Sequence, residues 1–216
     1  MCGPELHHYE VAIRTTAWNA EIQALGPLRH NRTVPRNWDE HYSNPDHVDL
    51  APEPLLVQAA DLLPPGRALD LACGPGRNAL HLARLGWQVT AVDSSAVAIG
   101  LLRRQAGGLP VDCTLADLEQ GEFSIKPGTY DLICDFFYLQ RNLFPPIRAG
   151  ITPGGVFAGA IHLFDSAPTT RPRNPDFLMH PGELRAEFDG WKVIFYSEGG
   201  EPERSRHTAR IIARRA

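Results

Sequence analysis

A short run at residues 68–79, ALDLACGPGRNA, carries residue types that suit the binding of a small ligand. Its two glycines let the backbone turn sharply and let a ligand approach the main chain without a clash. The pattern after the second glycine predicts a helix, whose first N–H groups and partial positive charge face the same bend. We therefore expect ligand contacts from this run, at Ala72, Gly74, Gly76, Arg77 and Asn78.

Two aspartates flank this bend and limit the kind of ligand. Asp70 lies four residues before Gly74, where an anionic carboxylate repels a pyrophosphate but suits a cation. Asp93, followed by Ser94, ends the next apolar run and can accept both hydroxyls of a ribose. Each has a structural alternative: Asp70 as a satisfied core or helix-capping carboxylate, and Asp93 as the N-cap of the next helix. The pair favours a positively charged nucleoside over a dinucleotide.

The apolar runs around the bend alternate with helical patterns. Strands are predicted at residues 67–72, 87–92, 110–115, 130–136 and 156–162, the last opened by Gly154 and Gly155. Helices are predicted at residues 54–63, 77–85, 95–105 and after 140, the last interrupted by Pro145 and Pro146. This alternation predicts an α/β protein with a doubly wound, mostly parallel, Rossmann-like sheet.

The C-terminal part has a different pattern. A long loop at residues 165–179 precedes a short helix at 181–188 and two strands at 191–198 and 207–213, joined by a turn containing Gly199 and Gly200. Two strands without an intervening helix predict an antiparallel strand pair at the edge of a seven-stranded sheet. Residues 1–35 are expected to form an N-terminal extension, with at most one short helix near 18–25, and residues 36–216 the main domain.

Composition excludes several classes of protein. The 216 residues are 43% hydrophobic and 21% charged, and the net charge of −4 argues against nucleic acid as a partner. The four cysteines show no CxxC spacing and the histidines no metal-binding helical spacing, so we expect neither a disulfide framework nor a bound metal. With no signal peptide or membrane span visible, we expect a cytoplasmic protein without membrane contact.

The run at residues 68–79 resembles the first motif of class I S-adenosylmethionine-dependent methyltransferases. The resemblance covers about residues 36–216 and implies S-adenosylmethionine as cofactor and S-adenosylhomocysteine as product. It further implies that Asp117 meets the adenine amino group, that Leu118 contacts the ring through its backbone, and that Asp135 and Phe136 lie beside the methyl-donor sulfur.

Within that class, the sequence is similar to the tellurite-resistance and thiopurine methyltransferases, which act on small molecules. The similarity is carried by WDEHY at residues 38–42, by GRNA at 76–79, and by GELR at 182–185 with Trp191. It implies that Trp38 and Tyr42 contribute to cofactor binding. Residues 1–35 have no counterpart in the resemblance.

Methyl transfer of this kind is an in-line displacement, which depends mainly on positioning. Thiols, chalcogen oxyanions and similar small acceptors need no strong general base. His162, at the end of the fifth strand, is a candidate to orient or deprotonate an acceptor, and Arg141 is a candidate partner for an anionic one. Aromatic side chains that can line such a site are Trp38, Tyr42, Phe136, Phe137 and Tyr138.

Other functions stay open at this point. The sequence lacks the Asp-or-Asn-Pro-Pro-Tyr and Pro-Cys motifs of nucleic-acid methyltransferases, which argues again for a small-molecule acceptor. A nicotinamide-dependent oxidoreductase of the Rossmann type is one alternative, and a non-catalytic relative that binds S-adenosylmethionine is another. The loop at 164–179 is long enough to act as a lid or to be ordinary coil. Both a monomer and a homodimer are compatible with the sequence.

Overall fold

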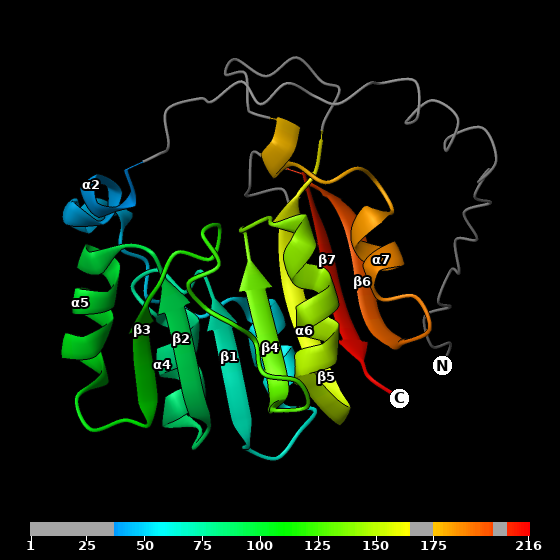
Figure 1. Ribbon diagram of the computed structural model, residues 1–216, viewed down its shortest axis with the longest axis horizontal. Helices are drawn as coiled ribbons and strands as arrows, with labels where there is room; N and C mark the ends of the chain where they lie inside the picture. The colour runs from blue at the N-terminus through cyan, green and yellow to red at the C-terminus, as the bar shows by residue number, and fades with distance from the viewer. Residues whose placement is uncertain (1–36, 165–174, 201–206) are drawn as a thin grey trace, which may run out of the picture. The chain divides into compact units, whose positions relative to one another are not determined.

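A computed structural model describes residues 37–164, 175–200 and 207–216. Within them, seven strands form one sheet in the order β3-β2-β1-β4-β5-β7-β6 (Figure 1). The strands are β1 Arg67–Leu71, β2 Gln88–Asp93, β3 Val111–Leu115, β4 Tyr130–Phe136, β5 Ile151–His162, β6 Lys192–Gly200 and β7 His207–Arg214. The first five pair in parallel, and β7 runs antiparallel to both β5 and β6. The predicted fold class is confirmed.

Helices cover both faces of the sheet. They are α2 Trp38–Ser43, α3 Pro54–Ala60, α4 Arg77–Arg84, α5 Ala96–Ala106, α6 Phe144–Gly150 and α7 Glu183–Glu187, with 3-10 turns η1 Pro45–His47, η2 Arg141–Leu143 and η3 Pro175–Phe177. Apolar residues of α3, α4 and α5 share one buried cluster with one face of the sheet. Residues of α6 and α7 form a second cluster on the other face. The doubly wound arrangement follows from these two separate cores.

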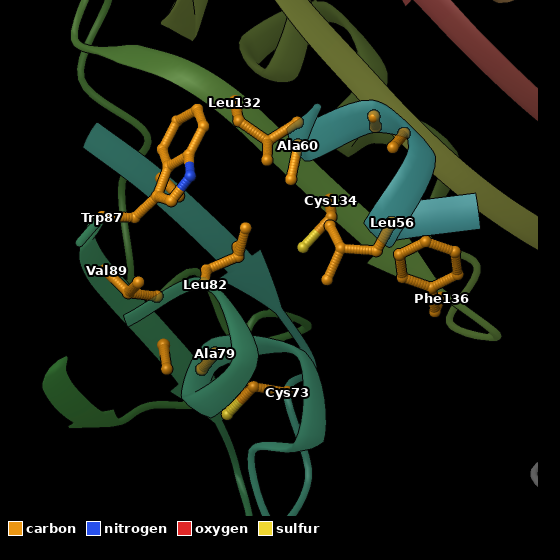
Figure 2. Close-up of a cluster of buried hydrophobic side chains, with 14 of the residues drawn as sticks. Leu56, Ala60, Cys73, Ala79, Leu82, Trp87, Val89, Leu132, Cys134 and Phe136 are labelled. Atoms are coloured by element: carbon orange, nitrogen blue, oxygen red, sulfur yellow. The ribbon is translucent and has the colours of Figure 1, made fainter. Parts of the chain in front are cut away.

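The first cluster lies directly beneath the bend that follows β1. Figure 2 shows Cys73 and Cys134 among its apolar side chains, together with Leu56, Leu82 and Trp87. Cys73, Cys113 and Cys134 are free thiols, and the first and last are buried. Cysteine in such a setting behaves as a small hydrophobic residue.

Two predicted strand boundaries at glycine pairs were wrong. β5 begins at Ile151, before Gly154, because Ile151 pairs with Tyr130 and the ladder then shifts register. Gly199 and Gly200 do not form the turn after β6, since they pair with Thr208 and His207 in the ladder. Gly154 and Gly155 lie within the register shift and exchange backbone hydrogen bonds with Arg215, which is the kind of irregular position that glycine often marks inside a strand.

Two helix predictions also need correction. Pro145 and Pro146 do not interrupt a helix, because they stand in the first turn of α6, where a missing N–H leaves no bond unmade. The helix α2 was not predicted from the sequence, and it begins after the N-cap Asn37. The Asn37 side chain accepts the Glu40 N–H at 3.2 Å, so an N-cap signal was present in the sequence.

Some predictions fall outside the described residues. The helix near 18–25, the extension at 1–35, Cys2 and residues 165–174 of the predicted loop all belong to this group. Of the loop's remainder, residues 175–177 form η3. In the described part of the chain, no helix combines the length and the hydropathy needed to span a membrane. The same residues contain no group of three or more metal-ligating side chains arranged around one point.

Candidate functional site

The backbone bends sharply where β1 ends. Ala72, Gly74 and Gly76 adopt positive φ angles of 49°, 55° and 89°, and the Cys73 N–H donates to Val92 O on β2 at 3.0 Å. A second residue with a side chain, Phe137, has a φ of 68° directly after β4, the neighbouring strand. Left-handed residues other than glycine are strained, and such strain gathers at functional sites. The carboxyl edge over β1 and β4 is therefore the candidate site.

Asp93 holds the bend from the end of β2. Its Oδ2 accepts the Gly74 N–H and its Oδ1 accepts the Ser95 N–H, both at 2.8 Å, while Ser94 is exposed. Burial raises the pKa of Asp93, and the N–H donors oppose that rise. Each carboxylate oxygen keeps a second lone pair, so the carboxylate has the capacity to accept two more hydroxyl groups. The N-cap of α5 is Ser95 rather than Asp93.

Asp70 does not face solvent at the strand end as the electrostatic argument assumed. It is buried at 1% exposure and accepts the Ala79 N–H of α4 at 3.1 Å and the Cys134 thiol at 3.3 Å. Burial raises its pKa to about 7, so the carboxyl is not fully ionised at neutral pH. Its contacts match the structural alternative, in which the carboxylate is hydrogen-bonded within the core and faces the start of a helix.

A third acid, Asp135, lies at the end of β4. It is 2% exposed, and its Oδ1 has no hydrogen-bond partner in the described part of the chain. Burial and the nearby Asp70 raise its pKa well above the ordinary value. Phe136 is buried next to it in the first core cluster. The adjacent strands β2, β1 and β4 thus carry three buried acids near their carboxyl ends, and a cation placed over them would favour their ionised forms, whereas a diphosphate would oppose ionisation.

The two glycines of the bend lie against different neighbouring side chains. A Cβ at Gly74 would lie 2.7 Å from the Tyr42 hydroxyl, so Tyr42 of α2 covers the bend. A Cβ at Gly76 would lie 2.2 Å from Leu102 Cδ1, inside the contact between α4 and α5. A valine at Gly76 would therefore meet the core, so Gly76→Val disturbs the fold and not only the approach of a ligand. Trp38 is 41% exposed and stacks on Tyr42 with ring centroids 5.9 Å apart.

Arg77 and Asn78 contact a preceding segment of the chain. Arg77 pairs with Glu53 at 2.6 Å and with Asp49 at 3.4 Å, and the Asn78 Oδ1 accepts the Glu53 N–H at 3.0 Å. These contacts account for both polar side chains without a ligand. The predicted cofactor contacts of Arg77 and Asn78 remain predictions.

A stack of side chains joins the bend to the end of β5. The Arg77 guanidinium lies 5.9 Å from the centre of the Phe137 ring, and the Phe137 ring also stacks on His162, at 5.1 Å between ring centroids. His162 ends β5 and is half-buried. The strained backbone at Phe137 therefore sets a ring between the two strand ends, and His162 lies at the carboxyl edge as the sequence predicted.

Asp117 and Leu118 lie in the loop after β3. The Asp117 Oδ1 accepts the Glu119 N–H at 2.8 Å, and Leu118 is buried. The Leu118 carbonyl accepts from Gln140 Nε2 at 3.2 Å, and Gln140 Oε1 accepts the Tyr138 hydroxyl at 2.6 Å. The loop after β4 thus supports the loop after β3, a connection that sequence spacing did not suggest.

Arg141 is not available as a partner for an anionic acceptor. Its Nε and Nη2 donate to the two carboxylate oxygens of Glu183 at 2.5 and 3.1 Å. Its Nη1 and Nη2 also donate to the carbonyls of Asp176 and Leu178. This set of bonds makes Arg141 structural in this arrangement. Glu183 was named only as part of a motif, because its partner is 42 residues away.

Sequence reasoning also missed the role of Asp39. Its Oδ1 accepts the Ser95 hydroxyl at 2.6 Å and the Val97 N–H at 3.1 Å, at the first turn of α5. The Ser95 hydroxyl lowers the pKa of Asp39, with the Val97 N–H adding to the effect. Since α2 has no buried residue of its own, this carboxylate and Tyr42 fasten it to the domain. No local signal predicts the contact, because the partners are 56 residues apart.

The antiparallel β7, lying between β5 and β6, distinguishes this sheet from fully parallel doubly wound sheets. With the glycine bend and the acid after β2, it defines the fold of the class I S-adenosylmethionine-dependent methyltransferases. The chain belongs to the TehB family, since the family model described as "Tellurite resistance protein TehB" matches residues 39–212. The resemblance predicted from the sequence is confirmed.

Known proteins similar to the chain agree with this family. It is 28% identical over 152 residues to a Haemophilus influenzae (strain 10810) protein named "Probable S-adenosyl-L-methionine-dependent methyltransferase TehB", covering 66% of this chain and 52% of that protein. It is 34% identical over 149 residues to the ubiquinone biosynthesis O-methyltransferase of Burkholderia lata, covering 65% of this chain and 62% of the other.

The fold is also that of a solved structure. The crystal structure of TehB from Haemophilus influenzae matches with a TM-score of 0.68 at 24% identity, covering 83% of this chain and 67% of that one. The chain spans about half the length of the first curated relatives that it matches.

Proposed function

We propose that this protein is a methyltransferase that uses S-adenosylmethionine and acts on a small-molecule acceptor. The observation that carries the proposal is the group of three buried acids, Asp70, Asp93 and Asp135, at the ends of adjacent strands. S-adenosylmethionine carries a sulfonium and an ammonium, which would lower the raised pKa values of these acids, whereas the diphosphate of a nicotinamide dinucleotide would raise them further. Membership of the TehB family supports the same assignment.

The residues at the carboxyl edge fit this cofactor. Gly74 brings the main chain of the bend close to the Tyr42 hydroxyl, with no space for a Cβ between them, and Asp135 Oδ1 is a buried acceptor without a partner in the described residues. Asp93 would accept the ribose hydroxyls, and Asp117 with the Leu118 backbone would hold the adenine. Trp38 and Tyr42 would cover the bend from α2. When bound, the cofactor supplies a methyl group on a positively charged sulfur.

The acceptor side of the site is the end of β4 and β5. His162 would orient the acceptor, because its ring is fixed by Phe137 at this edge. We propose a thiol, a chalcogen oxyanion or a similar acceptor, which is already nucleophilic and needs no strong base. The name of the matching family supports a chalcogen oxyanion, while the name of the O-methyltransferase relative supports testing a hydroxyl acceptor as well.

The setting of the enzyme is part of the proposal. The free thiols support a reducing compartment such as the cytoplasm. The net charge of −4 supports a small acceptor in place of a nucleic acid. We further propose that residues 36–216 form the methyltransferase domain.

Calorimetric titration with S-adenosylmethionine, S-adenosylhomocysteine and NAD⁺ tests the cofactor. We expect both adenosyl compounds to bind and NAD⁺ not to bind; binding of NAD⁺ alone would overturn the proposal. Transfer of a radiolabelled methyl group to tellurite, selenite and a panel of small thiols then tests the reaction. Cofactor binding with no transfer to any acceptor would identify a non-catalytic relative.

A further inference from the structure

One guanidinium joins two segments that are far apart in the chain. Arg141, in η2 after β4, meets both carboxylate oxygens of Glu183 in a fork, at 2.5 and 3.1 Å. The same group donates to the carbonyls of Asp176 and Leu178 at 3.1 and 2.9 Å. Glu183 also accepts the His180 N–H at 2.8 Å. Arg141 and Glu183 therefore fix the segment before α7 at several points.

That segment pairs through backbone hydrogen bonds with the end of β5. The Met179 N–H donates to His162 O at 2.9 Å, and the Phe164 N–H donates to Met179 O at 2.7 Å. Leu163 and Met179 form a parallel β-bridge, and Met179 is fully buried. The backbone from His162 to Phe164 is thus paired with the segment that Arg141 and Glu183 hold.

We propose that the Arg141–Glu183 pair is a positioning device for the acceptor side of the site. It keeps residues 176–180 against the end of β5, and so fixes His162 and the surface that an acceptor meets. A short pairing of two backbone hydrogen bonds frays readily unless another contact holds it. The forked guanidinium–carboxylate geometry supplies that contact with a fixed direction. This role rests on the proposed function, because the proposed function makes the end of β5 the acceptor side of the site. It involves no contact with the cofactor.

The chain contains a matched pair for comparison. Arg148 Nη1, on α6, meets Glu187 Oε2 at 2.5 Å and the Glu187 carbonyl at 2.7 Å. The carboxylates of Glu183 and Glu187 have similar side-chain exposures of 22% and 28%. Both pairs join the region after β4 to α7, but Glu187 ends that helix whereas Glu183 begins it. Glu187→Gln therefore reproduces the loss of an ion pair without touching the segment beside His162.

Amide hydrogen exchange tests the positioning role without an acceptor or a cofactor. In Glu183→Gln, we expect exchange at the Phe164 and Met179 amides to quicken about tenfold, because opening of the segment becomes easier. In Glu187→Gln, these two amides should exchange as in the parent protein. Equal exchange rates at both amides in all three proteins would overturn the proposal, as would equal acceleration in the two variants.

Steady-state kinetics with tellurite as the probe acceptor tests the consequence. We expect Glu183→Gln to raise the KM for tellurite about tenfold, the effect of losing one charge-assisted contact, and to leave the S-adenosylmethionine Kd within about twofold. Arg141→Lys should behave like Glu183→Gln, since lysine keeps the charge but loses the fork. A normal KM in Arg141→Lys would show that charge alone matters and would overturn the role. If the parent protein binds no S-adenosylmethionine, the proposed function fails, and the exchange result still decides the positioning role.

Discussion

At the carboxyl edge of the sheet, the acidic side chains have different partners on the two sides. On the donor side, formed by Asp70, Asp93 and the bend at residues 72–76, buried carboxylates accept N–H and S–H groups. On the acceptor side, formed by His162, Arg141 and residues 176–183, a carboxylate is closed in a forked ion pair. On the donor side, where we propose that a cationic cofactor binds, Asp70 and Asp93 form no ion pair among the described residues. On the acceptor side, Glu183 is paired with Arg141, and this pair fixes the local backbone.

The largest expected effect tests how closely the donor side is packed. Gly76→Val should reduce the free energy of unfolding by about 4 kcal/mol or more, because a positive φ and a clash with Leu102 add together. Urea unfolding followed by circular dichroism measures this loss.

Gly182, on the acceptor side, provides the control. It has a φ of 81°, and no described atom lies within 4 Å of the position that a Cβ would take, so Gly182→Val should lose only the backbone cost of about 1–2 kcal/mol. Equal losses for the two variants would mean that packing does not distinguish the two sides.

The second prediction concerns the raised pKa of Asp70. The folded chain holds this proton up to about pH 7, whereas an aspartate in the unfolded chain has a pKa of about 3.8. Between these values the unfolded state binds fewer protons, so the stabilising contribution is present at low pH and is lost as the pH rises through about 7. When the pH is raised from about 4.5 to 8, the ionisation of Asp70 should lower the free energy of unfolding by on the order of 3 kcal/mol.

The variant Asp70→Asn isolates that contribution. It keeps an acceptor for the Ala79 N–H but has no proton to lose, so its stability should fall less steeply over the same pH range. Urea unfolding of both proteins at several pH values gives the difference. Parallel curves for the two proteins would show that Asp70 is ionised in both states and would remove the contrast between the two sides.

The third prediction addresses cofactor affinity. Asp93→Ala should weaken S-adenosylmethionine binding by about 1.5–3 kcal/mol, because charge-assisted hydrogen bonds to the ribose are lost. Calorimetric titration measures the change, with Glu183→Gln as the acceptor-side control of unchanged affinity. An Asp93→Ala protein with the parent dissociation constant would exclude Asp93 from the site.

The smallest expected effect concerns α2, which contributes Trp38 and Tyr42. Asp39→Ala removes the acceptor of the Ser95 hydroxyl and the Val97 N–H, and should weaken cofactor binding by about 1 kcal/mol, the usual value of a lost helix cap. Binding affinity and the fluorescence of Trp38 report on the change together, after correction for the other tryptophans. Glu40→Ala on the same helix, where no such contact exists among the described side chains, should leave both unchanged.

The donor side was predictable because the residues that contact one another there lie close together in the sequence. Gly74, Gly76 and Asp93 follow strand ends that hydrophobic patterning marks, and Asp93 bonds an N–H of the bend that it follows by 19 residues. The seven strands were predicted for the same reason. The direction of the Asp70 side chain was not, because a period-two pattern does not reveal which face of a strand end a helix will cover.

The acceptor side was not predictable in the same way. Arg141 was recognised as chemically competent, but its partners are 35 to 42 residues away and lie on another element. Asp39 is a similar case, with partners on α5 that only the folded chain brings near. Where a side chain finds its partner through tertiary packing, the residue type indicates a capacity for a bond and the fold decides which bond forms.

The position of β7 has a consequence for synthesis on the ribosome. β7 is translated after β6 but inserts between β5 and β6, so the edge of β5 that faces β7 stays without its neighbour until residues 207–214 have emerged. An unpaired edge of this kind is a template for wrong pairing with another nascent chain. A ribosome that stalls within β6 would therefore release or display an aggregation-prone intermediate, and molecular chaperones that shield β5 would raise the yield of folded protein.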